Sequence, residues 1–127
     1  MEKLGFIGVG MMGKPMAKNL LKAGYELTVL DLNSAAVDEL VSQGAVRAES
    51  AAEVAGRCHT VITMLPDSAE VEYVVGGEGG LLSAINAEHL IVDMSTIDPL
   101  VSIRLACEVA SRGGQMIDAP VSGGEVG

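Results

Sequence analysis

Gly8-Val9-Gly10-Met11-Met12-Gly13 follows a short apolar run and opens a segment with helical spacing. The glycines have the GxGxxG spacing of a strand, turn and helix unit that holds a pyrophosphate. In such a unit Gly8 permits the tight turn, Gly10 lets a pyrophosphate approach the backbone, and Gly13 lets the helix pack on the strand. The start of the helix also offers unpaired N–H groups to an anion. This pattern predicts a dinucleotide-binding turn.

The same stretch fits most of a P-loop, because Gly13 and Lys14 follow Gly8 at the GxxxxGK spacing. The next residue is Pro15, where a P-loop needs Ser or Thr to hold Mg²⁺. Proline is compatible with a helix start but offers no ligand. Since Gly10 is specific to the dinucleotide motif, the pattern favours a dinucleotide over a nucleoside triphosphate.

Short β-branched runs alternate with longer helical segments along the rest of the chain, which is typical of βαβ units. Several runs are apolar almost throughout, as expected for strands covered by helices on both faces. We expect one α/β domain over residues 1–127, Rossmann-like and doubly wound, with a mostly parallel sheet of about six strands. The expected strands are Leu4–Val9, Glu26–Leu30, a weak one at Ala45–Arg47, Thr60–Leu65, His89–Met94 and Gln115–Ala119.

Start and stop signals bound the expected helices. Ser50 with Glu53, and Asp67 with Glu70, have the spacing of capping boxes, and Asp98 is an N-cap before a proline. Four glycines follow helical stretches and predict their ends: Gly24, Gly44, Gly56 and Gly113. The glycine-rich residues 76–80 predict a surface loop.

Composition limits the classes of function. A chain of 127 residues that is 49% apolar can bury a core, which excludes disorder. A net charge of −9 and a near absence of aromatic residues argue against nucleic acid as a partner. Every apolar run is far shorter than the ~20 residues needed to cross a membrane. Cys58 and Cys107 are far apart, with no metal-ligand spacing, so we expect no metal site and a reducing, cytoplasmic location.

Asp31 stands at the end of the second expected strand, where a carboxylate accepts hydrogen bonds from an adenosine ribose. The alternative is that Asp31 caps the helix that begins near Asn33. NADP would bring a phosphate against this acid, and neither Leu32 nor Asn33 supplies a compensating arginine. We therefore expect NAD rather than NADP as the cofactor.

All four lysines lie within residues 1–24. Lys14, Lys18 and Lys22 recur every four residues and so share one face of the first helix. Such a stripe is typical of a solvated face.

Residues 5–20, which read Gly5-Phe6-Ile7-Gly8-Val9-Gly10-Met11-Met12-Gly13-Lys14-Pro15-Met16-Ala17-Lys18-Asn19-Leu20, resemble the opening of the β-hydroxyacid dehydrogenases. This family contains 3-hydroxyisobutyrate dehydrogenase and tartronate semialdehyde reductase, and the first motif is most similar to the latter. Two further stretches match in order, Met64-Leu65-Pro66 and Asp118-Ala119-Pro120-Val121-Ser122-Gly123-Gly124. The resemblance implies the NAD-binding domain of an oxidoreductase that transfers a hydride between a nicotinamide cofactor and a small 3-hydroxy acid or its semialdehyde.

The resemblance also implies site residues. Leu65 and Pro66 would contact the nicotinamide side of the cofactor, with Glu70 or Val71 nearby, and Thr96 would lie against the nicotinamide. These residues follow expected parallel strands, at whose carboxyl ends ligands bind in α/β sheets. Leu65-Pro66 alone is equally compatible with an ordinary strand exit. The expected cofactor-binding set is Gly8, Gly10, Met11, Met12, Gly13, Asp31, Leu65, Pro66, Glu70, Val71 and Thr96.

Ser122, Gly123 and Gly124 resemble the family's site for the substrate carboxylate. A hydroxyl followed by two glycines can direct consecutive N–H groups at one carboxylate. Outside the longer motif, a Ser-Gly-Gly segment is more often only a turn.

In this family a lysine in a second, all-helical domain transfers the proton. The sequence has no lysine after Lys22 and reaches Gly127 where the family continues, so we expect no catalytic residue in it. His59 and His89 are expected to be structural. We expect the chain to bind NADH without turnover, with the C-terminal domain as its missing partner.

The surface left for that domain would be partly apolar, which leaves self-association open. Two alternatives stay open: a stand-alone dinucleotide-binding regulatory module without catalysis, and a structural assembly domain.

Overall fold

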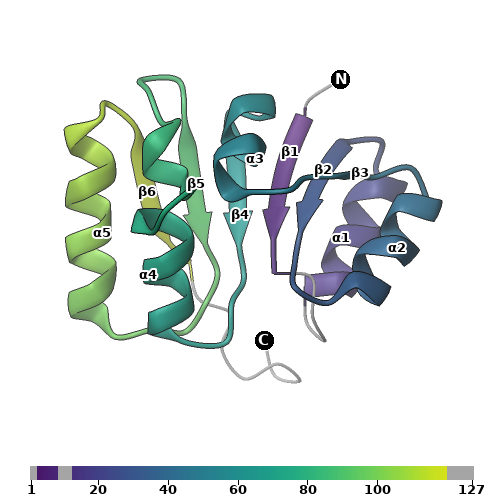
Figure 1. The fold of residues 1–127 in the computed structure, drawn as a ribbon, viewed down its shortest axis with the longest axis horizontal. Coiled ribbons are helices and arrows are strands. Elements are labelled where there is room, and N and C mark those ends of the chain that lie inside the picture. Colours follow the sequence, from purple (N-terminus) through teal and green to yellow (C-terminus); the bar gives the residue numbers. More distant parts are fainter. Residues whose placement is uncertain (1–2, 9–12, 120–127) are drawn as a thin grey trace.

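The computed structural model describes residues 3–8 and 13–119. Within these ranges strands and helices alternate along the chain (Figure 1). The elements are β1 (Lys3–Ile7), α1 (Gly13–Lys22), β2 (Glu26–Leu30), α2 (Ser34–Ser42), β3 (Val46–Arg47), α3 (Ala51–Arg57), β4 (Thr60–Thr63), α4 (Ser68–Gly76), the 3₁₀ turn η1 (Leu81–Ser83), β5 (Leu90–Asp93), α5 (Pro99–Ser111) and β6 (Gln115–Asp118).

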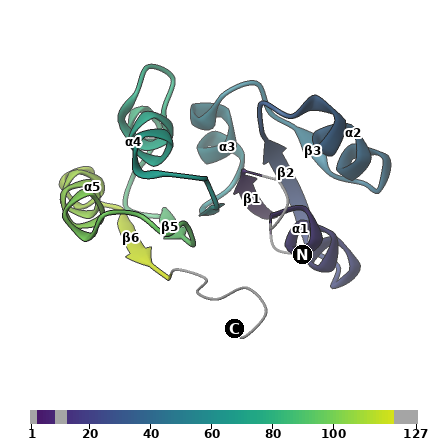
Figure 2. The same cartoon turned by 90° about the horizontal axis from the view of Figure 1, so that it is seen from below.

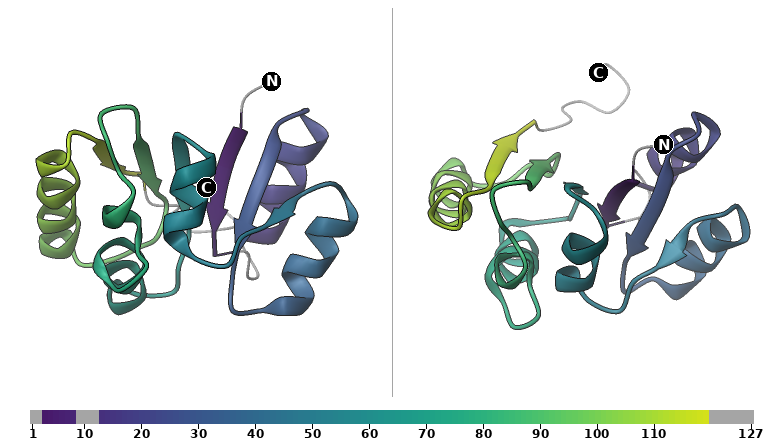
Figure 3. Two further views of the ribbon diagram at one scale, coloured as in Figure 1. Left: turned by 45° about the horizontal axis from the view of Figure 1, so that its top comes forward. Right: turned by 90° about the horizontal axis from the view of Figure 1, so that it is seen from above.

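The six strands form one sheet in the order β3-β2-β1-β4-β5-β6, and every pair of neighbours is parallel. Helices α1 and α2 lie on one side of the sheet, and α3, α4 and α5 on the other (Figure 2). In Figure 3, α2 and β3 lie at one end of the sheet and α5 and β6 at the other. The strand order runs outward from β1 in one direction and then outward from β4 in the other. The carboxyl ends of β1 and β4 therefore form the topological switch point, where open α/β sheets bind ligands.

Two apolar cores hold the layers together, one on each face of the sheet. Phe6 and Leu40 belong to the core under α1 and α2, whereas Ile7 and Leu105 belong to the core under α3, α4 and α5. Adjacent residues of β1 thus serve opposite cores, because side chains alternate across a strand. This burial on both faces confirms the doubly wound α/β fold expected from the sequence.

All six expected strands are present, and their ends differ from the expected ones by a few residues at most. β1 ends at Ile7 rather than Val9, because Gly8 has a φ of 98° and leaves the strand conformation. The expected caps are confirmed: Ser50, Asp67 and Asp98 each accept a hydrogen bond from a backbone N–H in the first turn of the following helix.

The prediction that Gly56 ends a helix is wrong. Gly56 lies within α3, which ends at Arg57 and is followed by Cys58 in an extended conformation. Because the chain leaves α3 directly toward β4, no left-handed turn is needed there. Gly24, by contrast, follows α1 with a φ of 98°. No helix within residues 3–8 and 13–119 has the length and apolar character needed to cross a membrane.

Candidate functional site

A cavity of about 780 Å³ opens at the carboxyl ends of β1, β2 and β4, where the strand order reverses. Its volume lies within the roughly 300–1,000 Å³ range of small-molecule and cofactor sites. The lining comes from the ends of these strands, from the segment that leads into α3, from α4 and from residues 78–80. The cavity is therefore the candidate ligand site of the domain.

Two glycines form the floor of this cavity. Gly8 has a φ of 98°, and its N–H donates to the Leu30 carbonyl at 3.0 Å. A Cβ on Gly8 would lie 2.0 Å from the Met64 carbonyl oxygen, and one on Gly13 would lie 2.1 Å from the Gly8 carbonyl oxygen. A side chain at either position would overlap protein backbone, so only glycines allow this close packing of β1, β4 and the start of α1. This backbone cradle has the close packing that pyrophosphate-binding turns use. Gly10, Met11 and Met12 lie outside the described residues.

Two lysines of the stripe on α1 point toward α2 and do not line the cavity. Lys14 Nζ lies 2.8 Å from Glu39 Oε1, and Lys18 pairs with the other oxygen of the same carboxylate. These hydrogen bonds from Lys14 and Lys18 lower the pKa of Glu39 to about 2. The stripe lies at the surface as expected, and two of its three lysines also pair there with an acid on α2. A P-loop lysine would line the ligand cavity, whereas Lys14 does not.

Asp31 lines the cavity at the end of β2. Its Oδ1 accepts a hydrogen bond from the Asn33 N–H at 2.9 Å, which helps to fix the carboxylate. Asn33 is the N-cap of α2 and accepts from the Ala36 N–H at 3.2 Å. The alternative that Asp31 caps this helix is therefore wrong. This hydrogen bond is local, between residues two positions apart, and the carboxylate lies at the rim of the cavity.

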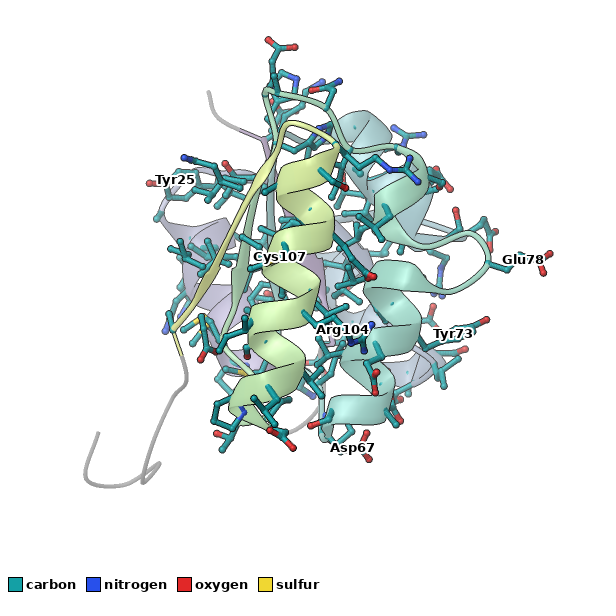
Figure 4. The ribbon with its side chains drawn as sticks, turned by 90° about the vertical axis from the view of Figure 1, so that its left-hand side faces the viewer. Tyr25, Asp67, Tyr73, Glu78, Arg104 and Cys107 are labelled. Atoms are coloured by element: carbon teal, nitrogen blue, oxygen red, sulfur yellow. The ribbon has the colours of Figure 1, made fainter. Side chains whose placement is uncertain are left out.

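The lining is acidic. Asp31, Glu49, Glu70 and Glu78 line the cavity, and its described lining contains no lysine or arginine. Tyr73 of α4 also lines it, and Figure 4 shows Tyr73 and Glu78 projecting on the same side of the molecule. An acidic rim favours ligand hydroxyl groups over a further phosphate at this position.

Sequence reasoning missed Glu49, Tyr73 and Glu78 as lining residues. Of the glycine-rich residues 76–80, Gly76 ends α4 and residues 77–80 form a loop. The Gly79 carbonyl accepts from the Ala52 N–H at 2.9 Å. This bond attaches the loop to the first turn of α3. The available signal was that Glu78 lies within the glycine-rich segment. The position of that segment beside the strand ends depends on tertiary contacts, which the sequence does not show.

The residues after β4 divide between cavity and core. Leu65, Pro66 and Glu70 line the cavity together. Val71 is fully buried in the core under α3, α4 and α5 and does not line it. Thr96, after β5, is exposed and also lies outside the lining. The structure thus brings together three of the five residues assigned to the nicotinamide side.

A buried polar cluster lies beside this end of the cavity. Asp93, at the end of β5, is fully buried, and its Oδ1 accepts from Thr63 Oγ1 at 2.9 Å and from the Ser95 N–H at 3.1 Å. The hydroxyl of Ser95 accepts from the Leu65 N–H at 2.8 Å. Desolvation and the charge of Asp93 raise the pKa of Asp118 on the neighbouring strand. Sequence reasoning passed over this cluster, because its contacts join residues about thirty positions apart.

The two histidines lie away from the cavity lining. His89 is buried, and its Nε2 donates to the Ala55 carbonyl at 2.6 Å while Nδ1 accepts from the Asn86 N–H at 3.1 Å. His59 is exposed, with its Nε2 3.8 Å from a carboxylate oxygen of Glu88. Across the described ranges, no group of three His, Cys, Asp or Glu side chains is placed to hold a metal ion.

Ser122, Gly123 and Gly124, assigned to the substrate carboxylate, lie outside the described residues. Their expected role therefore stays a prediction from the resemblance.

Residues 3–127 match the family described as the NAD binding domain of 6-phosphogluconate dehydrogenase. Over 125 residues the chain is 48% identical to 2-hydroxy-3-oxopropionate reductase of Escherichia coli (strain K12), a match that covers 98% of this chain and 42% of that protein. The structure is similar to Mycobacterium tuberculosis 3-hydroxyisobutyrate dehydrogenase with L-serine, with a TM-score of 0.84 and 34% identity over 97% of this chain and 41% of that one.

A reductive aminase from Aspergillus terreus in complex with NADPH4, cyclohexanone and allyl amine is similar with a TM-score of 0.81 and 30% identity, over 93% of this chain and 40% of that one. The chain therefore spans about two-fifths of the length of these relatives.

Proposed function

We propose, from the premise that this chain belongs to the family of the NAD binding domain of 6-phosphogluconate dehydrogenase, that its cavity holds NAD for an oxidoreductase acting on a small 3-hydroxy acid or semialdehyde. The observation that carries the proposal is the backbone cradle of Gly8 and Gly13 at the switch point, with Asp31 at its rim. This combination fits a diphosphate on the glycines and a ribose on the acid.

Different residues of the cavity would bind different parts of the cofactor. The pyrophosphate would lie over the turn from Gly8 to Gly13, where the start of α1 offers N–H groups. Asp31 would accept hydrogen bonds from the ribose hydroxyls. Leu65 and Pro66 would cover the nicotinamide side and exclude water from it. When bound, the nicotinamide group supplies or accepts the hydride, and the protein orients it.

NAD is proposed over NADP on electrostatic grounds. A 2′-phosphate would meet the Asp31 carboxylate, with Glu49 lining the same cavity. Placing a phosphate against carboxylates without a basic partner is unfavourable. Arg47, on neighbouring β3, is paired with Asp38 instead. Reducing cytosolic conditions are part of the proposal, since Cys58 and Cys107 are both free.

The substrate class follows from the relatives. One is named a 2-hydroxy-3-oxopropionate reductase and another a 3-hydroxyisobutyrate dehydrogenase, which supports a 3-hydroxy acid and its semialdehyde as the proposed substrate pair. Ser122, Gly123 and Gly124 are proposed to bind the substrate carboxylate. The sequence has no lysine after Lys22, and neither histidine lines the cavity, so the 127 residues are proposed to bind the cofactor without turnover.

Fluorescence titration tests the binding proposal. NADH emission should change saturably as the chain is added, and NADPH should bind more weakly by at least about tenfold, the effect of an uncompensated like charge. Tighter binding of NADPH than of NADH would contradict the assignment of the cofactor.

A steady-state assay tests the statement about turnover. The chain should not oxidise NADH in the presence of tartronate semialdehyde, because it has no lysine after Lys22 to match the proton-transferring lysine of the family that it resembles. Sustained oxidation above the enzyme-free rate would contradict this part of the proposal.

A further inference from the structure

We propose that the buried network of Thr63, Asp93 and Ser95 positions the nicotinamide end of the cavity, an inference that rests on the proposed function. Asp93 and Ser95 act here as positioning residues through the backbone of Leu65, which itself lines the cavity. Neither Asp93 nor Ser95 lines the cavity.

The network joins the ends of two neighbouring strands. Thr63 ends β4 and Asp93 ends β5, and the two residues are paired in register. The Thr63 hydroxyl donates to Asp93 Oδ1 at 2.9 Å, and the Ser95 N–H donates to the same oxygen at 3.1 Å. One carboxylate oxygen thus fixes the side chain that ends β4 and the backbone that leaves β5.

Ser95 passes this constraint to the cavity. Its hydroxyl accepts from the Leu65 N–H at 2.8 Å. The next residue, Pro66, has no N–H, so the Leu65 N–H is the last backbone donor of the turn before Asp67. The position of the Leu65-Pro66 turn over the cavity therefore depends on this bond.

A second link ties the same two loops further from the sheet. The Asp98 N–H donates to the hydroxyl of Ser68 at 3.0 Å. Thr96 lies on the chain between the two linked residues Ser95 and Asp98. The loop after β4, which contains Leu65 and Pro66, and the loop after β5, which contains Thr96, are thus held to each other at two points.

Burying this polar network costs folding free energy, which points to a role beyond stability. Thr63 and Asp93 are fully buried and Ser95 is 2% exposed. Asp93 Oδ2 has no hydrogen-bond partner among the residues that the structure describes. A buried carboxylate with incomplete hydrogen bonding destabilises a fold relative to an apolar residue of similar size. An apolar residue at position 93 would fill the same place in the sheet but could not hold Ser95.

The test compares two ligands that differ only at the nicotinamide end. NADH and ADP-ribose share the adenosine, the diphosphate and the second ribose, and ADP-ribose lacks the nicotinamide. Ser95→Ala should weaken NADH binding about fivefold, as expected for one lost hydrogen bond, and leave ADP-ribose binding within about twofold of the original value. The NADH emission enhancement should also fall in the bound state.

Matched variants control for folding and for general loss of polarity. Ser95→Thr retains the hydroxyl and should restore NADH binding. Ser102→Ala removes another buried hydroxyl, one without a partner among the described residues, and should change the affinity for neither ligand. Ser68→Ala removes the outer link, which is partly exposed, and should weaken NADH about twofold without affecting ADP-ribose. The Ser68 variant keeps the test available if Ser95→Ala does not fold.

Equal loss of NADH and ADP-ribose binding in Ser95→Ala would overturn the proposal, since it would indicate a general structural effect. Unchanged NADH binding in folded Ser95→Ala would also overturn it. If the original chain binds neither NADH nor ADP-ribose, the proposed function itself fails, which is a different result from a failure of positioning alone.

Discussion

The two ends of the cavity are built by opposite means. At the end formed by β1 and α1, the absence of side chains on Gly8 and Gly13 lets β1, β4 and the start of α1 pack closely and form the cradle. At the end formed by β4 and β5, Asp93 Oδ1 accepts from the Thr63 hydroxyl and the Ser95 N–H, and the Ser95 hydroxyl accepts from the Leu65 N–H. The first end depends on close backbone packing and the second on polar contacts. Substitutions at the two ends should therefore lower stability and binding for different physical reasons.

The largest expected effect is at the glycine end. Gly8→Ala should lower the free energy of unfolding by about 3 to 5 kcal/mol, because left-handed backbone strain adds to overlap with the Met64 carbonyl. Gly24→Ala is a matched control, since Gly24 has the same φ of 98° but no atom within 4 Å of an added Cβ. It should lose only about 1 to 2 kcal/mol. Equal losses in urea denaturation would mean that overlap with the Met64 carbonyl adds nothing to the backbone strain at Gly8.

At the polar end, Thr63→Val should lower the free energy of unfolding by about 1.5 to 3 kcal/mol, because it removes a hydrogen bond to a buried carboxylate. Thr28→Val on β2 is the control. Thr28 is also buried, but its side chain hydrogen-bonds to the thiol of Cys58, which is neutral because burial raises its pKa. The control should lose at most about 1 kcal/mol. A larger loss for Thr28→Val would remove the distinction between charged and neutral partners.

Asp31→Asn sharpens the comparison, because it changes a side chain at the glycine end without touching its backbone cradle. NADH binding should weaken by about 1 to 3 kcal/mol, the cost of a lost hydrogen bond to a charged group. Asp38→Asn, on the exposed side of α2, should leave the affinity unchanged, since Asp38 does not line the cavity. Calorimetric titration measures both variants, and an unchanged affinity for Asp31→Asn would exclude a ribose contact.

The smallest expected effect lies behind the glycine end, where Glu39 pairs with Lys14 and Lys18. The pKa of Glu39 is lowered from 4.5 to about 2, so ionised Glu39 stabilises the folded state above pH 4.5. This contribution should fall as the pH drops from 4.5 to about 2. Glu39→Gln should therefore be less stable than the original chain at pH 7, and the difference should shrink over that interval. A difference that grows on acidification would contradict the pairing.

The same contrast explains what the sequence could predict. The glycine turn and Asp31 are separated from their neighbours by few residues, so local spacing was enough to predict the cradle and the six strands. The caps at Ser50, Asp67 and Asp98 were readable for the same reason. The Lys14 and Glu39 pair depends on how two helices pack, and local periodicity carries no information about that.

The polar end was hidden for a physical reason as well. Asp93 stands in an apolar strand, and nothing nearby in the sequence indicates that Thr63 reaches it. Val71 follows Glu70 directly, yet one turns into the core and the other toward the cavity, because adjacent helical residues face different directions. A resemblance that gives residue types without orientation could not separate them.

Chemical-shift mapping of the chain with NADH tests the central claim most directly. We expect the backbone amide signals of Gly8, Gly13, Asp31 and Leu65 to shift saturably as NADH is added. Those around Ile103, which is exposed on the outer face of α5, should stay unchanged. Shifts confined to α5 and β6, with the signals of Gly8 and Gly13 unmoved at saturating NADH, would contradict it.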